Sequence, residues 1–503
     1  MAIKSLSATI TRKSGLVASL LAACVAAACA TNETHRSLDR LHPCLSSEGP
    51  TDALCGTVTV PENRHTGIGR QIRLWVVVLP SLASTANDDP LFFLAGGPGQ
   101  AAAQLASQIR GVFRQVQRTR DIVLVDQRGT GKSNPLNCRS SASSLREMTE
   151  RSSAALVRLR QCLEGYDADV RLYTTDIAMD DLDDVRAYLG YERINLYGGS
   201  YGTRAALVYL RQHGEHVRSI VLDGVAPTDM RLPLFTARDA QHALDKALAD
   251  CEADHGCHQT FPALASRIRN LIVSLDQHPR HVRIVHPRTG IAEEVEVDAR
   301  LVSSVIFSAL YSPLIASIVP ALVDRAEKDD FQGLFALALA NEDTGENMSI
   351  GMQLSVLCSE DASRVSPNEL AHQTSKSVFG AHLIGSQLEA CAMWPKGTVK
   401  ADYYRPVVSD VPVLVLSGEV DPVTPPVWGE AVVKHLSHGK HFIMPSTGHG
   451  VVMTPCGNRI VTDFVESGSV DGLDTDCIGD VRRPPFFLSP AGPDPAEGDS
   501  VAR

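Results

Sequence analysis

The chain has 503 residues, of which 44% are hydrophobic and 21% are charged. This balance is that of a globular protein and excludes a disordered, collagen-like or coiled-coil chain. The 47 Lys and Arg residues against 58 Asp and Glu residues give a net charge of −11 without an offsetting basic block, which argues against nucleic acid as a partner. The length suits about three domains or one elaborated enzyme domain.

Residues 1–30 are typical of an export signal. Basic residues precede an almost unbroken apolar stretch from Gly15 to Ala28, which is shorter than the roughly 20 residues of a membrane span. Two processing patterns compete. Ala28-Cys29-Ala30 fits ordinary signal cleavage, whereas Leu21-Ala22-Ala23-Cys24 resembles a bacterial lipoprotein box, of which Cys29 offers a weaker version. We expect a periplasmic or secreted protein whose only membrane contact would be a lipid on Cys24 or Cys29.

Short apolar strands alternate with helices between about residues 40 and 227. The first two strands, Gly56 to Val60 and Gln71 to Leu79, predict a hairpin. The later strands are expected at Leu91 to Leu94, Ile122 to Val125, Ile194 to Tyr197 and Ser219 to Leu222, and the helices at Ala101 to Val116, Thr175 to Leu189 and Tyr201 to Gln212. This alternation predicts a mostly parallel sheet with helices on both faces.

The pattern changes after Pro227. Residues 228–406 carry apolar residues at helical spacing, interrupted by a polar, strand-like stretch from His281 to Val297. Strand and helix patterns resume at 407–483, with strands at Val411 to Leu416 and His441 to Met444 and helices at Val427 to Leu436 and Arg459 to Val465. Residues 484–503 are rich in Pro, Gly and Asp, which predicts a disordered tail. The predicted fold is an α/β domain with a large helical insertion.

Gly198-Gly199-Ser200-Tyr201-Gly202 lies between a predicted strand and a predicted helix. G-x-S-x-G at such a junction is the nucleophile elbow of α/β-hydrolases, in which the glycines allow a very tight turn. The turn exposes the serine at the end of the sheet, and the helix that follows directs its positive end toward it. We therefore predict that Ser200 is a nucleophile.

A serine hydroxyl needs a base, and the base needs an orienting carboxylate. In α/β-hydrolases the chain order is serine, acid, histidine. Asp421 follows a late predicted strand, and His449 lies in a loop after the last one, so we predict that they complete the triad. Asp223, directly after another strand, is the rival acid, and Glu419 is a weaker rival.

The oxyanion of the reaction needs two N–H donors. One is expected from Tyr201, next to the nucleophile, and the other from the loop after an early strand. Ala95-Gly96-Gly97-Pro98-Gly99 occupies that loop, and its glycines allow close approach to a substrate oxygen. We predict Gly97 as the second donor, with Gly96 as the next choice.

Three other clusters do not fit ligand-binding motifs. Gly129 to Ser133 ends like a phosphate-binding loop, but Asp126 stands where that motif needs glycine, so Asp126 to Gly129 is interpreted as a polar turn bracing the oxyanion loop. The spacing of Cys251, His255, Cys257 and His258 does not match common zinc modules. The acidic run of Asp180, Asp181, Asp183 and Asp184 is interpreted as a solvated helix face. We expect neither a metal nor an organic cofactor.

Ten of the twelve cysteines follow the export signal, an even number that predicts disulfides in an exported chain. We expect sequence neighbours to pair: Cys44 with Cys55, Cys138 with Cys162, Cys251 with Cys257, Cys358 with Cys391, and Cys456 with Cys477.

Together these motifs resemble those of the secreted tripeptidyl aminopeptidase branch of the prolyl aminopeptidase family. The resemblance runs from about residue 50 to about 480, with a C-terminal region like that of this branch after about residue 380. The matching segments are Gly96 to Gly99, Asp126 to Gly129, Gly198 to Thr203, Asp421 to Pro425 and Gly448 to Gly450. It implies an α/β-hydrolase core with a helical cap and exopeptidase activity at free N-termini. Ala95 departs from the His or Asn common there, which bears on substrate preference rather than on the triad.

The resemblance also implies acidic cap residues that hold the substrate's ammonium group. Glu360 and Asp361 are the candidates, and the alternative is that they are surface acids capping a helix. The leading hypothesis is thus an exported serine exopeptidase that acts through an acyl-enzyme on peptides with a free N-terminus. A carboxylesterase acting on small esters is the alternative enzyme, and a non-catalytic binding protein is the third hypothesis. The sequence sets no oligomeric state.

Overall fold

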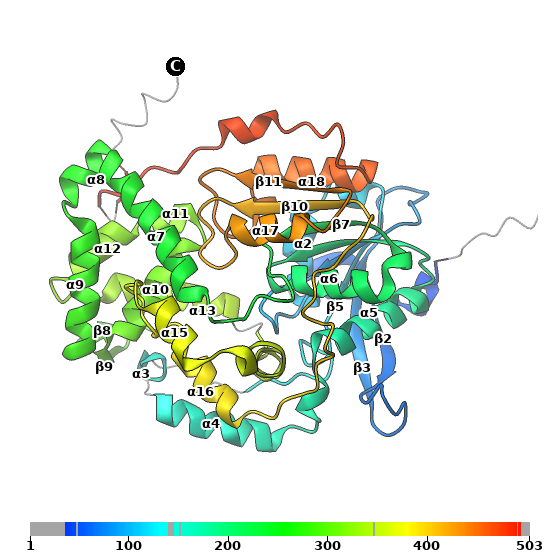
Figure 1. Ribbon diagram of the computed structural model, residues 1–503, viewed down its shortest axis with the longest axis horizontal. Coiled ribbons are helices and arrows are strands. Elements are labelled where there is room, and N and C mark those ends of the chain that lie inside the picture. The colour runs from blue at the N-terminus through cyan, green and yellow to red at the C-terminus, as the bar shows by residue number, and fades with distance from the viewer. Residues whose placement is uncertain are drawn as a thin grey trace, which may run out of the picture.

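The computed structural model describes residues 36–46, 49–138, 145–149, 152–345, 348–489 and 491–493. Within these residues, a nine-stranded sheet has the order β1-β2-β3-β5-β4-β6-β7-β10-β11 (Figure 1). The strands are β1 (His42–Ser46), β2 (Gly49–Pro61), β3 (Gln71–Leu79), β4 (Leu91–Leu94), β5 (Ile122–Val125), β6 (Ile194–Gly199), β7 (Val217–Asp223), β10 (Val413–Gly418) and β11 (Gly439–Met444).

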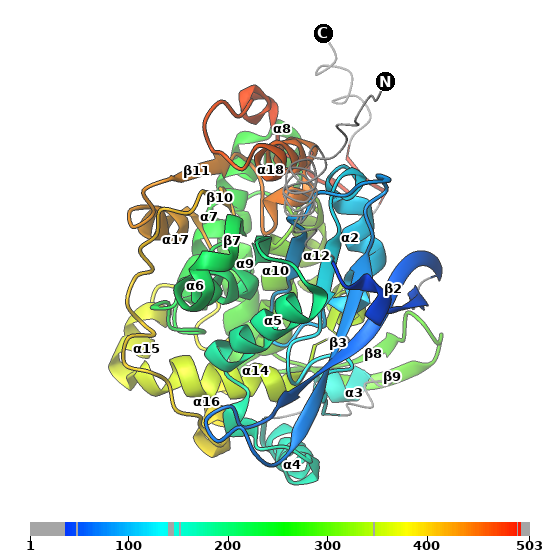
Figure 2. The same ribbon diagram turned by 90° about the vertical axis from the view of Figure 1, so that its right-hand side faces the viewer.

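The sheet is antiparallel at one edge and parallel elsewhere. β1, β2 and β3 run antiparallel to their neighbours, and β3 is antiparallel to β5. From β5 through β4, β6, β7 and β10 to β11, every pair is parallel. The predicted hairpin is the β2–β3 pair, whose turn end extends beyond the rest of the sheet in both ribbon views (Figure 2). The prediction of a mostly parallel sheet is confirmed.

Helices cover both faces because successive strand residues point to opposite sides. Phe92 and Leu94 of β4 pack into one apolar cluster, and Leu91 and Phe93 into another. The first cluster is completed by α5 (Thr175–Leu189), α6 (Tyr201–His213) and α17 (Pro426–Val433), and the second by α2 (Ala106–Val112) and α18 (Pro455–Ser467). All four β4 residues are buried, which explains the continuous apolar run in this strand.

A helical cap is inserted between β7 and β10 and lies beside the sheet (Figure 1). Its helices are α7 (Thr236–Ala253), α8 (His255–Thr260), α9 (Leu264–Gln277), α10 (Ala299–Leu310), α11 (Pro313–Ala316), α12 (Val319–Ala326), α13 (Gln332–Gly345), α14 (Ile350–Val356), α15 (Pro367–Thr374) and α16 (Gly385–Met393). The polar stretch predicted as strand forms the hairpin of β8 (Arg280–Val285) and β9 (Ala292–Val297). A separate apolar core, with Phe331, Phe335 and Phe379 fully buried, stabilises the cap.

Two segments outside the insertion also join the cap. α3 (Leu145–Met148) contributes the buried Leu145 to the cap core, and α4 (Ser152–Gly165) contacts α16. The predicted disorder of the tail is wrong for residues 484–489. Phe486 is 4% exposed in the cap core, and the Phe487 N–H donates to the Ser317 carbonyl over 3.1 Å. These aromatic residues supply the apolar surface that packs against the cap, whereas the prediction of disorder rested on the Pro- and Gly-rich composition alone. Residues 494–503 and the predicted export signal lie outside the described residues.

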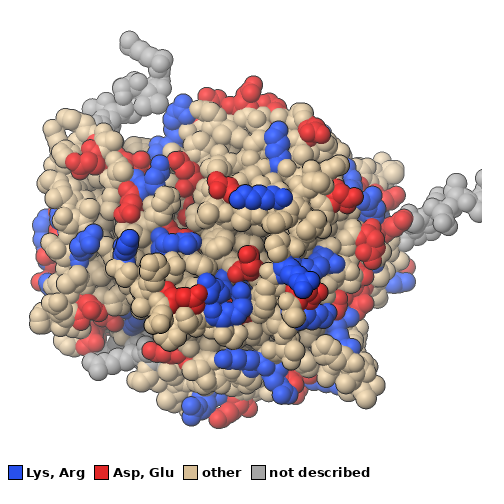
Figure 3. All heavy atoms as spheres, in the orientation of Figure 1, with Lys and Arg blue, Asp and Glu red and all other residues tan. Residues whose placement is uncertain are grey.

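Five disulfides are present, each joining the sequence neighbours expected to pair. They link Cys44 to Cys55, Cys138 to Cys162, Cys251 to Cys257, Cys358 to Cys391 and Cys456 to Cys477. None of the helices in the described part of the chain has the length and apolar character to cross a membrane. Acidic and basic side chains are interspersed over the face seen in Figure 3, so this face has no extended patch of one sign.

Candidate active site

Ser200 occupies the sharp turn between β6 and α6. Its backbone has φ 57° and ψ −126°, a conformation that residues other than glycine rarely adopt. The turn depends on the glycines around it. A Cβ on Gly198 would lie 2.3 Å from the Gly202 carbonyl oxygen, and one on Gly202 would lie 2.1 Å from the Leu94 carbonyl oxygen. The elbow therefore holds Ser200 at the carboxyl end of a central strand, with the N-terminus of α6 beneath it.

Asp421 and His449 follow the two neighbouring strands β10 and β11. His449 Nδ1 lies 2.7 Å from Asp421 Oδ2, and the Asp421 carboxylate is fully buried. The N–H groups of Val423 and Thr424 donate to Asp421 Oδ1, each over 2.8 Å, and the Thr424 hydroxyl donates to Oδ2 over 2.8 Å. The carboxylate is thus fixed from several sides. With Nδ1 engaged by Asp421, Nε2 is the nitrogen of His449 available for proton transfer.

Asp421 and His449 each stabilise the charged form of the other. Burial raises the pKa of Asp421, but the adjacent His449 and the hydrogen bonds from Thr424 and Val423 outweigh burial, and the net pKa lies below the ordinary value. Burial lowers the pKa of His449, but the neighbouring Asp421 carboxylate outweighs this, and the net pKa lies above the ordinary value. The imidazole is therefore a stronger base than an isolated histidine.

Tyr311, at the end of cap helix α10, also positions His449. The His449 backbone N–H donates to the Tyr311 carbonyl oxygen over 2.9 Å. The two rings meet edge to face, with centroids 5.2 Å apart. Tyr311, His449 and Ser200 line one cavity. The cap thus holds the loop that carries the imidazole.

The two rival acids occupy other places in the site. The fully buried Asp223 accepts the N–H groups of Val451 and Val452 and the hydroxyl of Tyr197, each over 2.8 Å. Glu419 pairs with Lys246 over 2.9 Å and accepts the Ser446 N–H over 3.0 Å. Both acids hold the backbone on either side of His449, whereas Asp421 contacts its ring.

The expected oxyanion loop lies directly against Ser200. A Cβ on Gly96 would lie 3.1 Å from the Ser200 Cβ, and Gly97 has φ 108°, which favours glycine. Gly96 and Gly97 line the same cavity as Ser200, and Tyr201 begins α6 directly after Ser200. The donors predicted from Tyr201 and Gly97 are thus on the two segments that flank the Ser200 hydroxyl.

The polar turn at Asp126 to Gly129 braces the segment after this loop. Asp126 accepts the backbone N–H groups of Ala103 and Lys132 over 2.9 and 3.0 Å. The buried Arg128 binds both oxygens of Asp181, at 2.7 and 2.8 Å. Asp181 is 2% exposed, so the interpretation of its acidic run as wholly solvated is wrong at this position. Its partner Arg128 lies too far away in the chain for helical spacing to reveal the ion pair.

Glu360 and Asp361 do not lie in the cavity, so the expectation that they bind a substrate ammonium is wrong. Both are fully buried. Asp361 pairs with Arg204 over 2.7 Å, and Glu360 accepts the backbone N–H of Thr175 over 2.7 Å and its hydroxyl over 2.9 Å. Burial raises the pKa of Glu360 to about 7 despite the nearby Arg204. These acids anchor the cap to α5 and α6, a role set by Arg204 and not visible in the local sequence.

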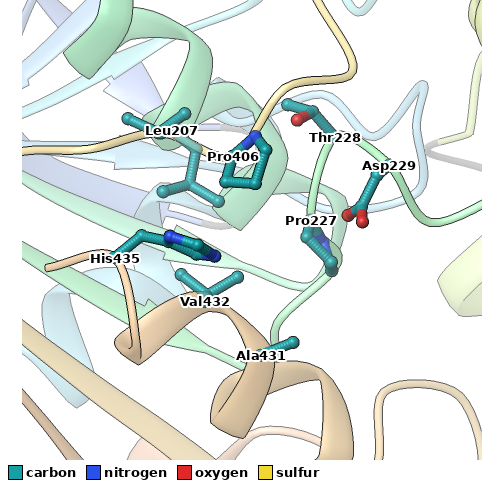
Figure 4. A pocket seen from close by; sticks show the side chains of 9 residues that line it. Leu207, Pro227, Thr228, Asp229, Pro406, Ala431, Val432 and His435 are labelled. Atoms are coloured by element: carbon teal, nitrogen blue, oxygen red, sulfur yellow. The ribbon is translucent and has the colours of Figure 1, made fainter.

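The cavity at Ser200 has a volume of about 440 Å³. Core residues Phe93, Ile109 and Phe113 form one wall, and Met348 and Gln353 of the cap contribute to the other. A second cavity of about 60 Å³ lies between α6 and α17, lined by Leu207, Pro227, Thr228, Asp229, Pro406, Val407, Ala431, Val432 and His435 (Figure 4). Only the first contains the Ser200 and His449 side chains.

The part of the chain that the structure describes contains no group of His, Cys, Asp and Glu residues suited to a metal ion. Cys251 and Cys257, the pair that invited a zinc reading, are joined in a disulfide.

Two site residues escaped the sequence reasoning. Thr424 contacts both Asp421 and His449, and its position three residues after Asp421, within a tight Pro-containing turn, was an available signal. Tyr311 lies more than a hundred residues before both Asp421 and His449 in the sequence, within a helical segment, and offered no sequence signal.

Comparison with known proteins matches two segments of the chain, each of which includes residues of both the sheet domain and the cap. Residues 89–260 match the family model described as alpha/beta hydrolase fold, and residues 376–477 match the one described as TAP-like protein. The serine protease Hip1 of Mycobacterium tuberculosis (strain ATCC 25618 / H37Rv) is 26% identical over 479 residues, which cover 86% of this chain and 90% of Hip1. The tripeptidyl aminopeptidase of Streptomyces lividans is 24% identical over 464 residues, covering 85% of this chain and 84% of that protein.

Two further likenesses are weaker, one because it is short and the other because its identity is low. The proline iminopeptidase of Neisseria gonorrhoeae is 31% identical over 137 residues, covering 27% of this chain and 32% of that protein. The crystal structure of the Mycobacterium smegmatis proline iminopeptidase is 16% identical, with a TM-score of 0.36 and coverage of 82% of this chain and 98% of that one. The sheet topology, the two family models and the relatives that match over most of their length show that this chain has the α/β-hydrolase fold, carries a TAP-like C-terminal region and is a serine hydrolase.

Proposed function

We propose that this serine hydrolase is an exported exopeptidase that releases N-terminal residues or short peptides, with Ser200 as nucleophile, His449 as base and Asp421 as orienting acid. The observation that carries the proposal is the 2.7 Å contact of His449 Nδ1 with the buried Asp421, in the cavity that also contains the strained Ser200. An elbow, a base and a buried acid at the ends of three strands meet the requirements of acyl transfer.

In the proposed reaction, His449 Nε2 takes the Ser200 proton as Oγ attacks the carbonyl carbon of the scissile bond. The N–H groups of Tyr201 and Gly97 stabilise the negative oxygen that forms. Collapse of the tetrahedral intermediate breaks the C–N bond, and His449 gives its proton to the leaving amine. Water, activated by the same imidazole, then attacks the acyl-enzyme and releases the acid product with Ser200 restored.

The position of the cap supports action at chain ends. Tyr311, Met348 and Gln353 of the cap line the cavity together with core residues, so cap and core enclose the place where the reacting carbonyl would lie. The relatives named as a serine protease and a tripeptidyl aminopeptidase favour a peptide over other acyl substrates. Five disulfides and the N-terminal signal pattern support export.

One observation favours a carboxylesterase as the second candidate. Among the described residues that line the cavity, Asp223 is the single carboxylate, and its two oxygens already accept three hydrogen bonds. The cavity wall therefore offers no unengaged acid to an ammonium group. A peptidase of this geometry would hold the free N-terminus beyond the cavity, whereas an esterase would need no such group.

Three substrates with the same acyl group distinguish the two functions: a tripeptidyl anilide with a free N-terminus, its N-acetylated form, and the corresponding simple ester. We expect the free peptide to have the highest kcat/KM, and Ser200→Ala to lower kcat by several orders of magnitude while leaving the circular dichroism spectrum unchanged. Preference for the ester or the acetylated anilide would favour the esterase. Near-normal turnover by Ser200→Ala would refute the catalytic assignment.

A further inference from the structure

We propose that the cavity beside Ser200 selects substrates whose acyl-side residue, the one that becomes attached to Ser200, has a bulky and uncharged side chain. This inference rests on the proposed function and specifies its substrate class. It is carried by the chemistry of the cavity wall, which Ser200 and His449 line together with the apolar residues.

The wall behind the oxyanion loop is apolar. Phe93 at the end of β4 and Ile109, Val112 and Phe113 at α2 line the cavity, and Phe93, Ile109 and Phe113 are at least 91% buried. Phe93 stacks on Tyr197, with ring centroids 5.5 Å apart, and Phe113 meets the same ring edge to face at 4.9 Å. These rings fix one another, so the wall is a preformed apolar surface.

The polar groups of the cavity are neutral or already engaged. Gln100, Gln108 and Gln353 line it, and Gln100 Oε1 accepts the Gly96 N–H over 3.3 Å. Lys and Arg are absent from the described lining residues, and Asp223, the one acid, has its oxygens occupied. A Lys, Arg, Asp or Glu side chain placed here would lose its hydration without gaining an opposite charge.

The direction of the reaction assigns this wall to the acyl side. His449 must protonate the leaving group, so the leaving group lies on the side of the imidazole. We take the carbonyl oxygen to face Gly97 and Tyr201, and we infer that the remaining substituent of the carbonyl carbon lies against the apolar residues that share the cavity with Ser200, Phe93 and Val112 among them. A volume of about 440 Å³ accommodates a leucine, methionine or phenylalanine side chain there.

The test uses a series of tripeptidyl anilides that differ only in the acyl-side residue, which is Leu, Phe, Lys or Glu. Wild-type enzyme should hydrolyse the Leu and Phe substrates with kcat/KM at least about 100-fold above the Lys and Glu substrates, since an unpaired buried charge is strongly disfavoured. Hydrolysis of the Lys or Glu substrate within about threefold of the Leu substrate would overturn the proposal.

Variants assign this selectivity to the wall. Val112→Asp adds a carboxylate to the wall, and Gln108→Glu does so at an exposed lining position that tolerates charge without unfolding. At least one of them should raise kcat/KM for the Lys substrate relative to Leu about tenfold or more. Val408→Asp, at a position 78% exposed and outside the cavity, is the matched control and should leave the ratio unchanged. An unchanged ratio in both cavity variants would contradict the assignment of the wall.

Failure of the proposed function has a different signature. If none of the anilides is cleaved while a fluorophosphonate still labels Ser200, the peptidase assignment fails. Methyl esters of the same four acyl groups then measure the selectivity directly. A Leu and Phe preference among the esters would uphold the apolar acyl site, and equal rates would reject it.

Discussion

Asp421 is held in place by its surroundings rather than by its single contact with the imidazole. The N–H groups of Val423 and Thr424 and the Thr424 hydroxyl fix its carboxylate, so the carboxylate cannot rotate away from His449 Nδ1. The carboxylate both selects the tautomer of His449 and raises its pKa. These two effects can be separated by substitution.

We predict that Asp421→Asn lowers kcat by about 10⁴-fold, because an amide donor at Nδ1 favours the wrong tautomer of His449. Activity requires neutral His449, so wild-type kcat/KM should fall as the pH drops through the His449 pKa, which lies above the ordinary value. Without the carboxylate that pKa falls, and the acidic limb of the residual activity should shift to lower pH. A pH–kcat/KM profile of both proteins checks this, and an acidic limb at the same pH in both would contradict it.

At the scale of elements, α6 is anchored to the cap by charges rather than by apolar packing alone. Arg204 of α6 donates to Asp361, to the Pro227 carbonyl and to the Met230 carbonyl, over 2.7 to 3.2 Å. Arg204, Glu360 and Asp361 are all fully buried, and the partly exposed Arg364 also pairs with Asp361 over 3.1 Å, so the charges of this cluster compensate one another. The helix that begins at Tyr201 is therefore held by the residues that follow α14.

Removing the arginine should expose this dependence. Arg204→Met removes the cation beside Glu360 and leaves Asp361 with Arg364 alone, and it should lower the free energy of unfolding by about 3–5 kcal/mol. Arg171→Met is the control, because Arg171 forms an exposed ion pair with Asp169, and such pairs contribute little to stability. Urea denaturation of the two variants measures both values. Similar losses in the two variants would contradict the structural role assigned to Arg204.

Short sequence patterns predicted those parts of the fold that a few consecutive residues determine. Examples are the apolar runs at β4, β5 and β6 and the strand–turn–helix context of Ser200. Asp421 and His449 were placed by chain order relative to strands, which the parallel sheet preserves. Glu360 and Asp181 were misread because their partners Arg204 and Arg128 are distant in sequence. Tyr311 was missed because packing of the cap, not local sequence, brings it to His449.

At the scale of the whole molecule, the C-terminal segment joins the core to the cap. It leaves the core after the Cys456–Cys477 disulfide, and Arg483 then pairs with Asp250 of α7 over 3.2 Å. Phe486 enters the cap core, and the Phe487 N–H binds the Ser317 carbonyl. This segment thus adds to the other attachments of the cap, which are its two connections to the sheet, the ion pair of Arg204 with Asp361 and the hydrogen bond of His449 to Tyr311.

We predict that Phe486→Ala lowers the free energy of unfolding by about 3–5 kcal/mol, the usual cost of truncating a buried phenylalanine. Phe487→Ala is the matched control, because its side chain is only partly buried and its backbone hydrogen bond survives the change. Thermal unfolding should show a clearly larger loss for Phe486→Ala. Equal losses would mean that Phe486 does not anchor the segment.

The bond from His449 N–H to the Tyr311 carbonyl has a consequence for turnover. The cap encloses the cavity and also carries this carbonyl, so a swing of the cap that lets product escape must pull on the loop that bears the base. The place of the imidazole in this arrangement is therefore tied to the place of the cap, and any displacement of Tyr311 would also displace His449.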